Sequence, residues 1–244
     1  MPTMTSLPRL LHALVLAALA LSAPGAHAQP RKDTAVLALA LEPPGLDPTT
    51  GAASAIAEIV LYNVFETLTR IGSDGSTSPL LAEGWTVSPD LKSWTFKLRR
   101  GVQFQNGEPF EAATVKYAFE RAAEKGSANK DRATFANIER ISTPDPATVV
   151  LLLKNGNPDL LFQLGQATAV IVEPKSAASN STQPVGTGPY KLESWSKGSA
   201  VTLQRWEGYR AAKDIALRRV TLRFISDPAA QVAALLSGDR KSVV

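Results

Sequence analysis

The chain has 244 residues, of which 44% are hydrophobic and 20% are charged. This composition is typical of a globular protein and excludes the disordered and fibrous classes. The formal net charge of +4 is too weak a bias to favour nucleic acid or a membrane surface as a partner.

The N-terminal segment differs from the rest of the chain. Arg9 is its only charged side chain, residues 10–21 form a largely apolar run, and small residues flank His27. These features predict a secretory signal peptide over residues 1–28, cleaved between Ala28 and Gln29. A membrane anchor is the alternative, but the run is shorter than the roughly 20 residues that a bilayer requires.

The chain has no cysteine, and both histidines, His12 and His27, lie in the predicted signal peptide. The mature chain would therefore lack Ser-His-Asp and Cys-His nucleophiles, His- or Cys-ligated metals and disulfides. We predict no catalytic residue, no metal site and no cofactor, so the protein is not expected to be an enzyme. Without a cysteine to carry a lipid, a periplasmic protein that is not embedded in the membrane is expected.

The first half of the mature chain begins with a predicted strand over residues 34–41, an apolar run of the kind buried on both faces. Three prolines and a glycine make residues 42–48 an irregular loop. Apolar residues at helical spacing predict a helix over 52–67. Apolar and polar side chains alternate over residues 93–99, which predicts a strand. Val102 and Phe104 continue this period of two up to a tight turn at Asn106-Gly107.

The second half alternates between helices and strands. Residues 111–125 have apolar side chains on one helical face, and Pro158 begins a short helix that ends at 164. A polar loop is predicted over 175–183, and Asp227 caps a last helix, which Gly238 ends. The further strands are predicted over residues 148–153, 168–172, 190–195, 200–206 and 217–225.

Several sequence blocks occur in a fixed order along the mature chain. The blocks are Leu46-Asp47-Pro48, residues 81–85 (LAEGW), 88–90 (SPD), 94–104 (WTFKLRRGVQF), 106–110 (NGEPF), 184–192 (PVGTGPYKL) and the helix from Asp227. Their order and spacing resemble the family 5 extracellular solute-binding proteins. These are the oligopeptide, dipeptide and nickel-type binding proteins of ABC importers.

The sequence departs from the family pattern at three places. The usual His-Asp-Gly turn is Gln105-Asn106-Gly107, and the usual Tyr-Trp pair is Tyr209-Arg210. We interpret both as variations in surface turns. Family members also continue into a whole second lobe, so the resemblance implies that this chain is a fragment or a truncated gene product.

The implied fold is α/β and periplasmic-binding-protein-like, of type II (cluster C). It comprises the first lobe with an inserted β-rich subdomain, and the second lobe is missing. The expected division places lobe I, which is discontinuous, at 29–50 and 168–239. The inserted subdomain spans 51–167, and 240–244 form a truncated tail.

Family members are two-lobed clamps that close on a ligand, and the resemblance implies which residues of the first lobe bind it. The ligand-binding strip follows the Leu-Asp-Pro motif and consists of Thr50, Gly51, Ala52, Ala53 and Ser54. Their small side chains leave the backbone accessible to an extended peptide. Alternatively, Thr49, Thr50 or Ser54 only caps a helix. Tyr190, which follows a glycine-rich turn, is a further ligand-binding candidate.

The implied function is that of the periplasmic substrate-binding component of an ABC importer for peptides. Its expected partners are a small peptide or related solute and the permease and ATPase subunits, with the binding protein itself a monomer. Dipeptides, oligopeptides and glutathione-like molecules all remain candidate ligands. Nickel is disfavoured because the mature chain has no histidine. The alternatives are a sensor, a chaperone or an interaction protein with the same fold, or a non-functional fragment.

Overall fold

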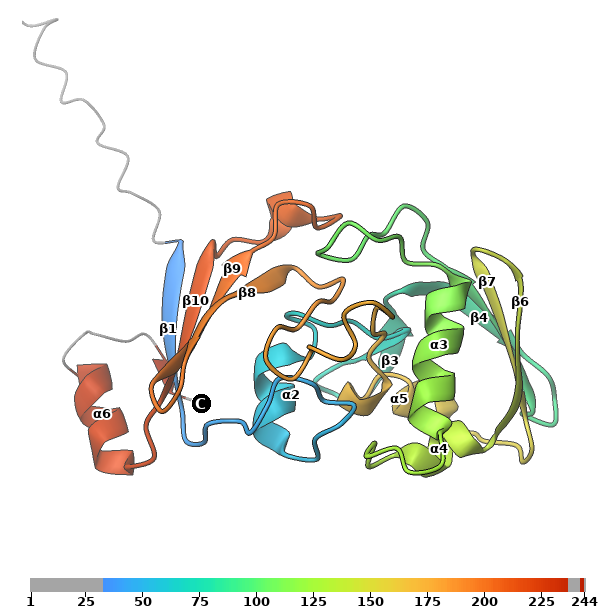
Figure 1. The fold of residues 1–244 in the computed structure, drawn as a ribbon, viewed down its shortest axis with the longest axis horizontal. Coiled ribbons are helices and arrows are strands. Elements are labelled where there is room, and N and C mark those ends of the chain that lie inside the picture. The colour runs from blue at the N-terminus through green and yellow to red at the C-terminus, as the bar shows by residue number, and fades with distance from the viewer. Residues whose placement is uncertain (1–32, 237–241, 244) are drawn as a thin grey trace, which may run out of the picture. The chain divides into compact units, whose positions relative to one another are not determined.

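A computed structural model describes residues 33–236 and 242–243 (Figure 1). The predicted signal peptide, its cleavage site at Ala28-Gln29 and the predicted helix end at Gly238 lie outside these residues. None of the described helices is long and apolar enough to cross a bilayer.

A five-stranded sheet combines strands from both ends of the described chain (Figure 1). Its strands are β1 (Thr34–Leu39), β8 (Tyr190–Ser196), β9 (Ala200–Arg205), β10 (Arg219–Phe224) and β11 (Ser242–Val243), in the order β11-β1-β10-β9-β8. β1 runs parallel to β10, whereas β8, β9 and β10 pair antiparallel. The four predicted strands are confirmed. Only Ala38 and Leu39 of β1 are buried, however, so burial along the whole strand was wrong.

A four-stranded antiparallel sheet comes from the middle of the chain. It consists of β4 (Ala82–Val87), β5 (Ser93–Leu98), β7 (Thr148–Leu153) and β6 (Ile138–Asp145), in that order. Trp94, Phe96 and Leu98 are buried and Lys97 is exposed, which confirms the predicted alternation along β5. The chain therefore leaves the first sheet after β1, forms this second sheet, and returns at β8.

One face of α3 (Ala112–Ala123) packs against β6 and β7 (Figure 1). Val115, Ala118, Phe119 and Ala122 are buried on this face, as their helical spacing predicted. The short helix α4 (Arg132–Ala136) packs on α3, with the rings of Phe119 and Phe135 5.3 Å apart.

Apart from the final helix, the remaining elements are short. They are α2 (Ser54–Val60), β2 (Thr69–Ile71), β3 (Thr77–Pro79), α5 (Leu160–Gln163) and the 3-10 turns η1 (Ala167–Ala169) and η2 (Ala212–Asp214). Two of them, β2 and β3, pair as a small antiparallel sheet. α5 confirms the short helix begun by Pro158, and turns fill the predicted polar loop at 175–183. The final helix α6 (Pro228–Leu236) begins as predicted, since Asp227 Oδ1 accepts a hydrogen bond of 2.6 Å from the Ala230 N–H.

The helix predicted over 52–67 is shorter than expected and ends at Val60. Leu61 is extended and Tyr62 has a left-handed φ of 59°. The Tyr62 hydroxyl explains this conformation, because it donates to the Gly165 carbonyl (2.7 Å) and accepts from the Ile71 N–H (2.9 Å). Val64 and Phe65 are still fully buried. The apolar pattern therefore predicted correctly which residues are buried, but it overestimated the length of the helix.

One predicted strand does not form, and the alternation that follows 93–99 does not extend that strand. The segment 168–172 contains η1 and irregular backbone, although Val170, Ile171 and Val172 are buried. Their burial without sheet pairing explains why the apolar run resembled a strand. Val102 and Phe104 lie outside any named strand, in a tight loop closed by a single bridge between Gln103 and Pro109.

Candidate functional site

The loop 42–48 is anchored at both ends, although its prolines prevent regular pairing. Glu42 accepts hydrogen bonds from the Trp195 indole (3.0 Å) and the Gly198 N–H (2.9 Å) at the turn between β8 and β9. The Leu46 N–H donates to the Ser181 carbonyl (2.8 Å), and the Leu46 side chain is fully buried. The loop therefore has a defined path from the first sheet toward α2.

A buried charge network follows at the Leu-Asp-Pro motif. Asp47 Oδ1 accepts from the Thr49 N–H (2.8 Å) and from the Thr49 hydroxyl (2.6 Å). Arg121, in the last turn of α3, donates to Thr49 Oγ1 (2.7 Å) and lies 3.5 Å from Asp47 Oδ2. The Asp47 side chain is only 2% exposed, so the guanidinium supplies the charge compensation that a buried carboxylate requires.

The predicted strip, Thr50 to Ser54, begins directly after this network. Thr50, Ala52, Ala53 and Ser54 are exposed, and Gly51 is half-buried. The backbone N–H groups of Gly51, Ala52 and Ala53 have no intramolecular acceptor among the described residues. Ala53 is extended, with φ −69° and ψ 129°. A short run of accessible backbone is therefore available to hydrogen-bond a ligand.

The alternative role of these residues as helix caps is wrong. The N-cap of α2 is Ala53, and no side chain caps this helix. The Thr49 hydroxyl bonds Asp47 instead, and the Thr50 hydroxyl lies 3.4 Å from the Asp47 carbonyl. The polar side chains next to the strip hold the loop in shape rather than starting the helix.

Tyr190 lies at the start of β8, with its ring in the core. Its side chain is buried, and its hydroxyl donates to the Leu217 carbonyl at 3.0 Å. Burial raises the pKa of this phenol. The structure thus places Tyr190 within the packing of the first sheet and gives its hydroxyl a partner there.

The turn before Tyr190 passes against the segment after α2. The Gly188 N–H donates to the Val64 carbonyl and the Tyr190 N–H to the Asn63 carbonyl, both at 2.9 Å. A Cβ on Gly188 would lie 2.4 Å from the Asn63 carbonyl oxygen, and one on Gly186 would lie 2.0 Å from that of Val64. Only glycine permits this approach of two backbones, so the glycines of this turn are required for packing.

Gln105 is not the surface-turn variation that the sequence suggested. Its Nε2 donates to the carbonyls of Tyr190 (2.7 Å) and Gly188 (3.2 Å), and its Oε1 accepts from the Gly186 N–H (3.3 Å). The side chain therefore fastens the turn after β5 to the glycine-rich turn. No local pattern indicates this role, because the partners lie more than 80 residues away.

Arg210 also differs from the prediction of a solvated surface turn. Both of its terminal nitrogens donate to the Glu66 carboxylate at 2.7 Å. Thr187 Oγ1 donates to the same carboxylate at 3.0 Å, and the Tyr209 hydroxyl lies 3.3 Å away. Burial alone would lower the pKa of Arg210, but its hydrogen bonds and charge interaction with Glu66 raise it overall. The pair is a structural link between a buried carboxylate and a partly exposed guanidinium.

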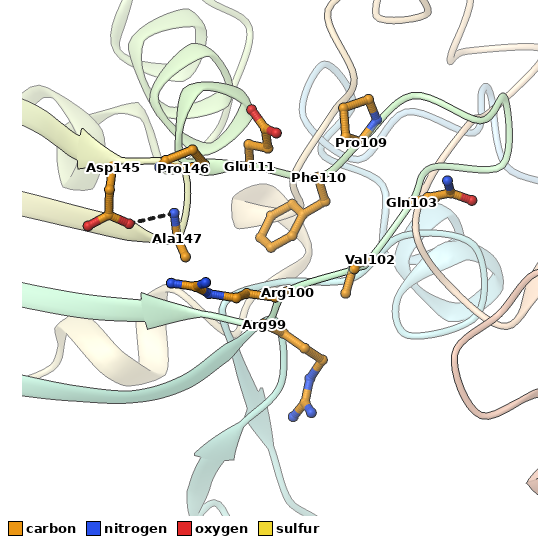
Figure 2. Close-up of a pocket in the computed structure, with 11 residues that line it drawn as sticks. Arg99, Arg100, Val102, Gln103, Pro109, Phe110, Glu111, Asp145, Pro146 and Ala147 are labelled. Atoms are coloured by element: carbon orange, nitrogen blue, oxygen red, sulfur yellow. Dashed lines mark hydrogen bonds between the residues drawn. The ribbon is translucent and has the colours of Figure 1, made fainter.

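A separate groove of about 370 Å³ lies beside β5 and the start of α3 (Figure 2). Figure 2 shows Arg100, Phe110 and Asp145 among its lining residues. Asp145 already accepts from the Ala147 N–H (2.8 Å), and hydrogen bonds from Thr148 and Ala147 lower its pKa. None of the strip residues lines this groove, and Asp145 is used to hold the turn between β6 and β7.

Comparison with known proteins gives a consistent family assignment. A family model described as bacterial extracellular solute-binding proteins, family 5, matches residues 76–243. The glutathione-binding protein GsiB of Salmonella choleraesuis is 32% identical over 198 residues, which are 80% of this chain and 38% of that protein. The chain thus spans well under half the length of the curated relatives it matches.

Solved structures share the fold. The binding protein AgaA of A. tumefaciens R10, in complex with agropinic acid, superposes with a TM-score of 0.79 at 32% identity, over 86% of this chain and 43% of AgaA. NikZ of Campylobacter jejuni, in complex with Ni(L-His), gives a TM-score of 0.76 at 26% identity, over 87% and 43% of the two chains. The predicted periplasmic-binding-protein-like α/β fold is confirmed over this part. The chain belongs to the family 5 bacterial extracellular solute-binding proteins.

Proposed function

We propose that this protein is the substrate-binding component of an ABC importer and that it binds a small peptide or related solute in the periplasm. It would deliver this ligand to a permease driven by an ATPase, working as a monomer after removal of residues 1–28. The family membership supports the transport role. One observation carries the location of the site: the backbone N–H groups of Gly51, Ala52 and Ala53 have no acceptor among the described residues.

The chemistry of this strip suits an extended ligand. Backbone N–H and C=O groups pair with a peptide in the way that an added strand does, and they do so without selecting its side chains. The small side chains of Gly51, Ala52 and Ala53 let the ligand backbone come close. Thr50 and Ser54, at the two ends of the strip, carry hydroxyl groups that can accept or donate. Tyr190, with its ring in the core and its hydroxyl bonded to the Leu217 carbonyl, would contribute indirectly, by stabilising the first sheet.

The relatives suggest which ligands to test first. GsiB is named as a glutathione-binding protein, and AgaA was solved with agropinic acid, both at 32% identity to this chain. We propose glutathione and trialanine as the first probes, because both present peptide groups to the strip. Nickel complexes are a lower priority, since the described residues contain no group of three metal-ligating side chains.

Nuclear magnetic resonance tests the proposal at single residues. The chain, labelled with ¹⁵N, would be titrated with glutathione and with trialanine to high millimolar concentrations. We expect saturable shifts at the amides of Gly51, Ala52 and Ala53. If the matched residues supply about half the binding energy of a micromolar site, the dissociation constant will be near millimolar, about −4 kcal/mol.

Two results would contradict the proposal. Shifts confined to the groove around Phe110 would place the ligand elsewhere. An absence of shifts at residues 50–54 with both probes, and with a wider dipeptide and oligopeptide set, would remove the strip as a binding site.

A further inference from the structure

The strip proposed to bind ligand has no regular secondary structure of its own, yet its two ends are fixed. Thr49, directly before it, bonds Asp47 through both its N–H and its hydroxyl. Ser54, at its far end, begins α2, which buries Ala55, Ile56, Ile59 and Val60. The four residues between these two fixed points have little freedom, so the position of Thr49 sets the position of the strip.

Arg121 determines where Thr49 lies. The Thr49 hydroxyl donates to Asp47 Oδ1 and at the same time accepts from Arg121, so its hydrogen-bonding capacity is used on both sides. Arg121 also provides the charge partner of the buried Asp47 at 3.5 Å. The guanidinium fork suits this task because it can contact two acceptors in a fixed geometry.

The network crosses between distant parts of the chain. Arg121 belongs to α3, which packs against β6 and β7 of the four-stranded sheet, whereas Asp47 and Thr49 follow the five-stranded sheet. Arg121 and Asp47 are 74 positions apart in the sequence. The side chain of Arg121 is 23% exposed and is directed to these two residues, so its role is in holding the loop.

We infer that Arg121 is a positioning residue for the ligand-binding strip: through Thr49 and Asp47 it holds the backbone of Gly51 to Ala53 in the conformation that accepts ligand. This inference rests on the proposed function for its effect on affinity. Its effect on the order of the strip is independent of any ligand. If Arg121 is removed, the strip samples other conformations, and the apparent affinity falls by the fraction of time spent in the competent one.

The variants must separate positioning from folding. Arg121→Gln alone leaves the buried Asp47 without its cation and can unfold the chain. The double variant Asp47→Asn/Arg121→Gln removes both charges, and the amide oxygen introduced at position 47 can still accept from the Thr49 N–H. Arg121→Lys keeps the positive charge and is the conservative rescue. Arg219→Gln is the matched control, because Arg219 pairs with Glu193 on an exposed sheet face away from the strip.

The experiment measures ¹⁵N order parameters of Gly51, Ala52 and Ala53, the dissociation constants for glutathione and trialanine, and the melting temperature. In the double variant, we expect a melting temperature close to that of the control and order parameters that fall from about 0.85 to below about 0.6. The affinity should fall about tenfold, as expected for a strip that is competent about one tenth of the time. Arg121→Lys should recover most of both losses.

The two proposals fail in different ways. Unchanged order parameters in the double variant would overturn the positioning role of Arg121, even if both probes bind the wild-type chain. A strip that loosens in the double variant, in a chain that binds neither probe nor the wider peptide set, would support the positioning role and reject the proposed function. An equal loss of affinity in Arg219→Gln would also overturn the inference, because it would show a general effect of removing an arginine.

Discussion

Arg210 and Glu66 form a bidentate ion pair, with both nitrogen–oxygen distances at 2.7 Å, although 144 positions separate them in the sequence. The Glu66 side chain is 2% exposed and Arg210 is 23% exposed. Thr187 donates to the same carboxylate, so the pair also fixes the glycine-rich turn. This link joins the segment after α2 to the segment after β9.

Breaking this pair should destabilise the protein strongly. In Arg210→Met, the buried Glu66 loses its counter-charge and two of its donors. We expect a loss of about 3 kcal/mol in the free energy of unfolding, at the lower end of the usual range because Arg210 is partly exposed. Urea denaturation measures this. The double variant Arg210→Met/Glu66→Gln should recover part of the loss, and a double variant as unstable as the single one would contradict the electrostatic explanation.

The close approach of Gly188 to Asn63 makes a second prediction. Gly188→Ala places a Cβ 2.4 Å from a backbone oxygen, so one of the two backbones must move. We expect a loss of at least about 2 kcal/mol in unfolding free energy. Gly84→Ala is the matched control, because a Cβ there meets no atom within 4 Å, and it should change stability by less than about 0.5 kcal/mol. Equal effects of the two substitutions would reject the packing explanation.

Gln105 provides a third test. Gln105→Leu leaves the carbonyls of Tyr190 and Gly188 and the Gly186 N–H without this partner. Buried groups that lose a partner typically destabilise a protein by about 1–3 kcal/mol, so we expect about 2 kcal/mol. Chemical denaturation would be compared with that of Gln204→Leu, an exposed position on β9. A Gln105→Leu variant as stable as Gln204→Leu would show that water replaces the lost bonds.

Local patterns predicted those parts of the fold that local chemistry determines. Alternation placed Trp94, Phe96 and Leu98 on one buried face of β5, and helical spacing gave the buried face of α3. The same reasoning overextended the helix at 52–67, because Val64 and Phe65 are buried without being helical. Their conformation depends on Tyr62, whose hydroxyl bonds Gly165, 103 positions away.

The candidate site shows the same division. The Leu-Asp-Pro motif indicated the strip at 50–54, and in the structure all of these residues except the half-buried Gly51 are exposed. Sequence alone could not show that Arg121 reaches Thr49, or that Arg210 pairs with Glu66, because both contacts join segments far apart. The sequence placed Arg210 in a surface turn, and only the three-dimensional packing shows that its partner, Glu66, is buried.

Tyr209 predicts how stability responds to alkaline pH. Burial, and then the negative charge of Glu66, raises the pKa of its phenol above the ordinary value near 10. The folded state therefore favours the neutral phenol, and this contribution to stability is complete below about pH 10 and is lost as the pH rises through the folded-state pKa. In Tyr209→Phe, residue 209 cannot ionise, so the unfolding free energy should fall less between about pH 9 and 11 than in the wild type. At pH 7 the variant should lose only about 1 kcal/mol, for one hydrogen bond. Urea titrations at about pH 7, 9, 10 and 11 measure both effects.

Burial also raises the pKa of Tyr190, so Tyr190→Phe/Tyr209→Phe should flatten the pH dependence further. Parallel pH profiles for the wild type and both variants would show that neither phenol is linked to folding.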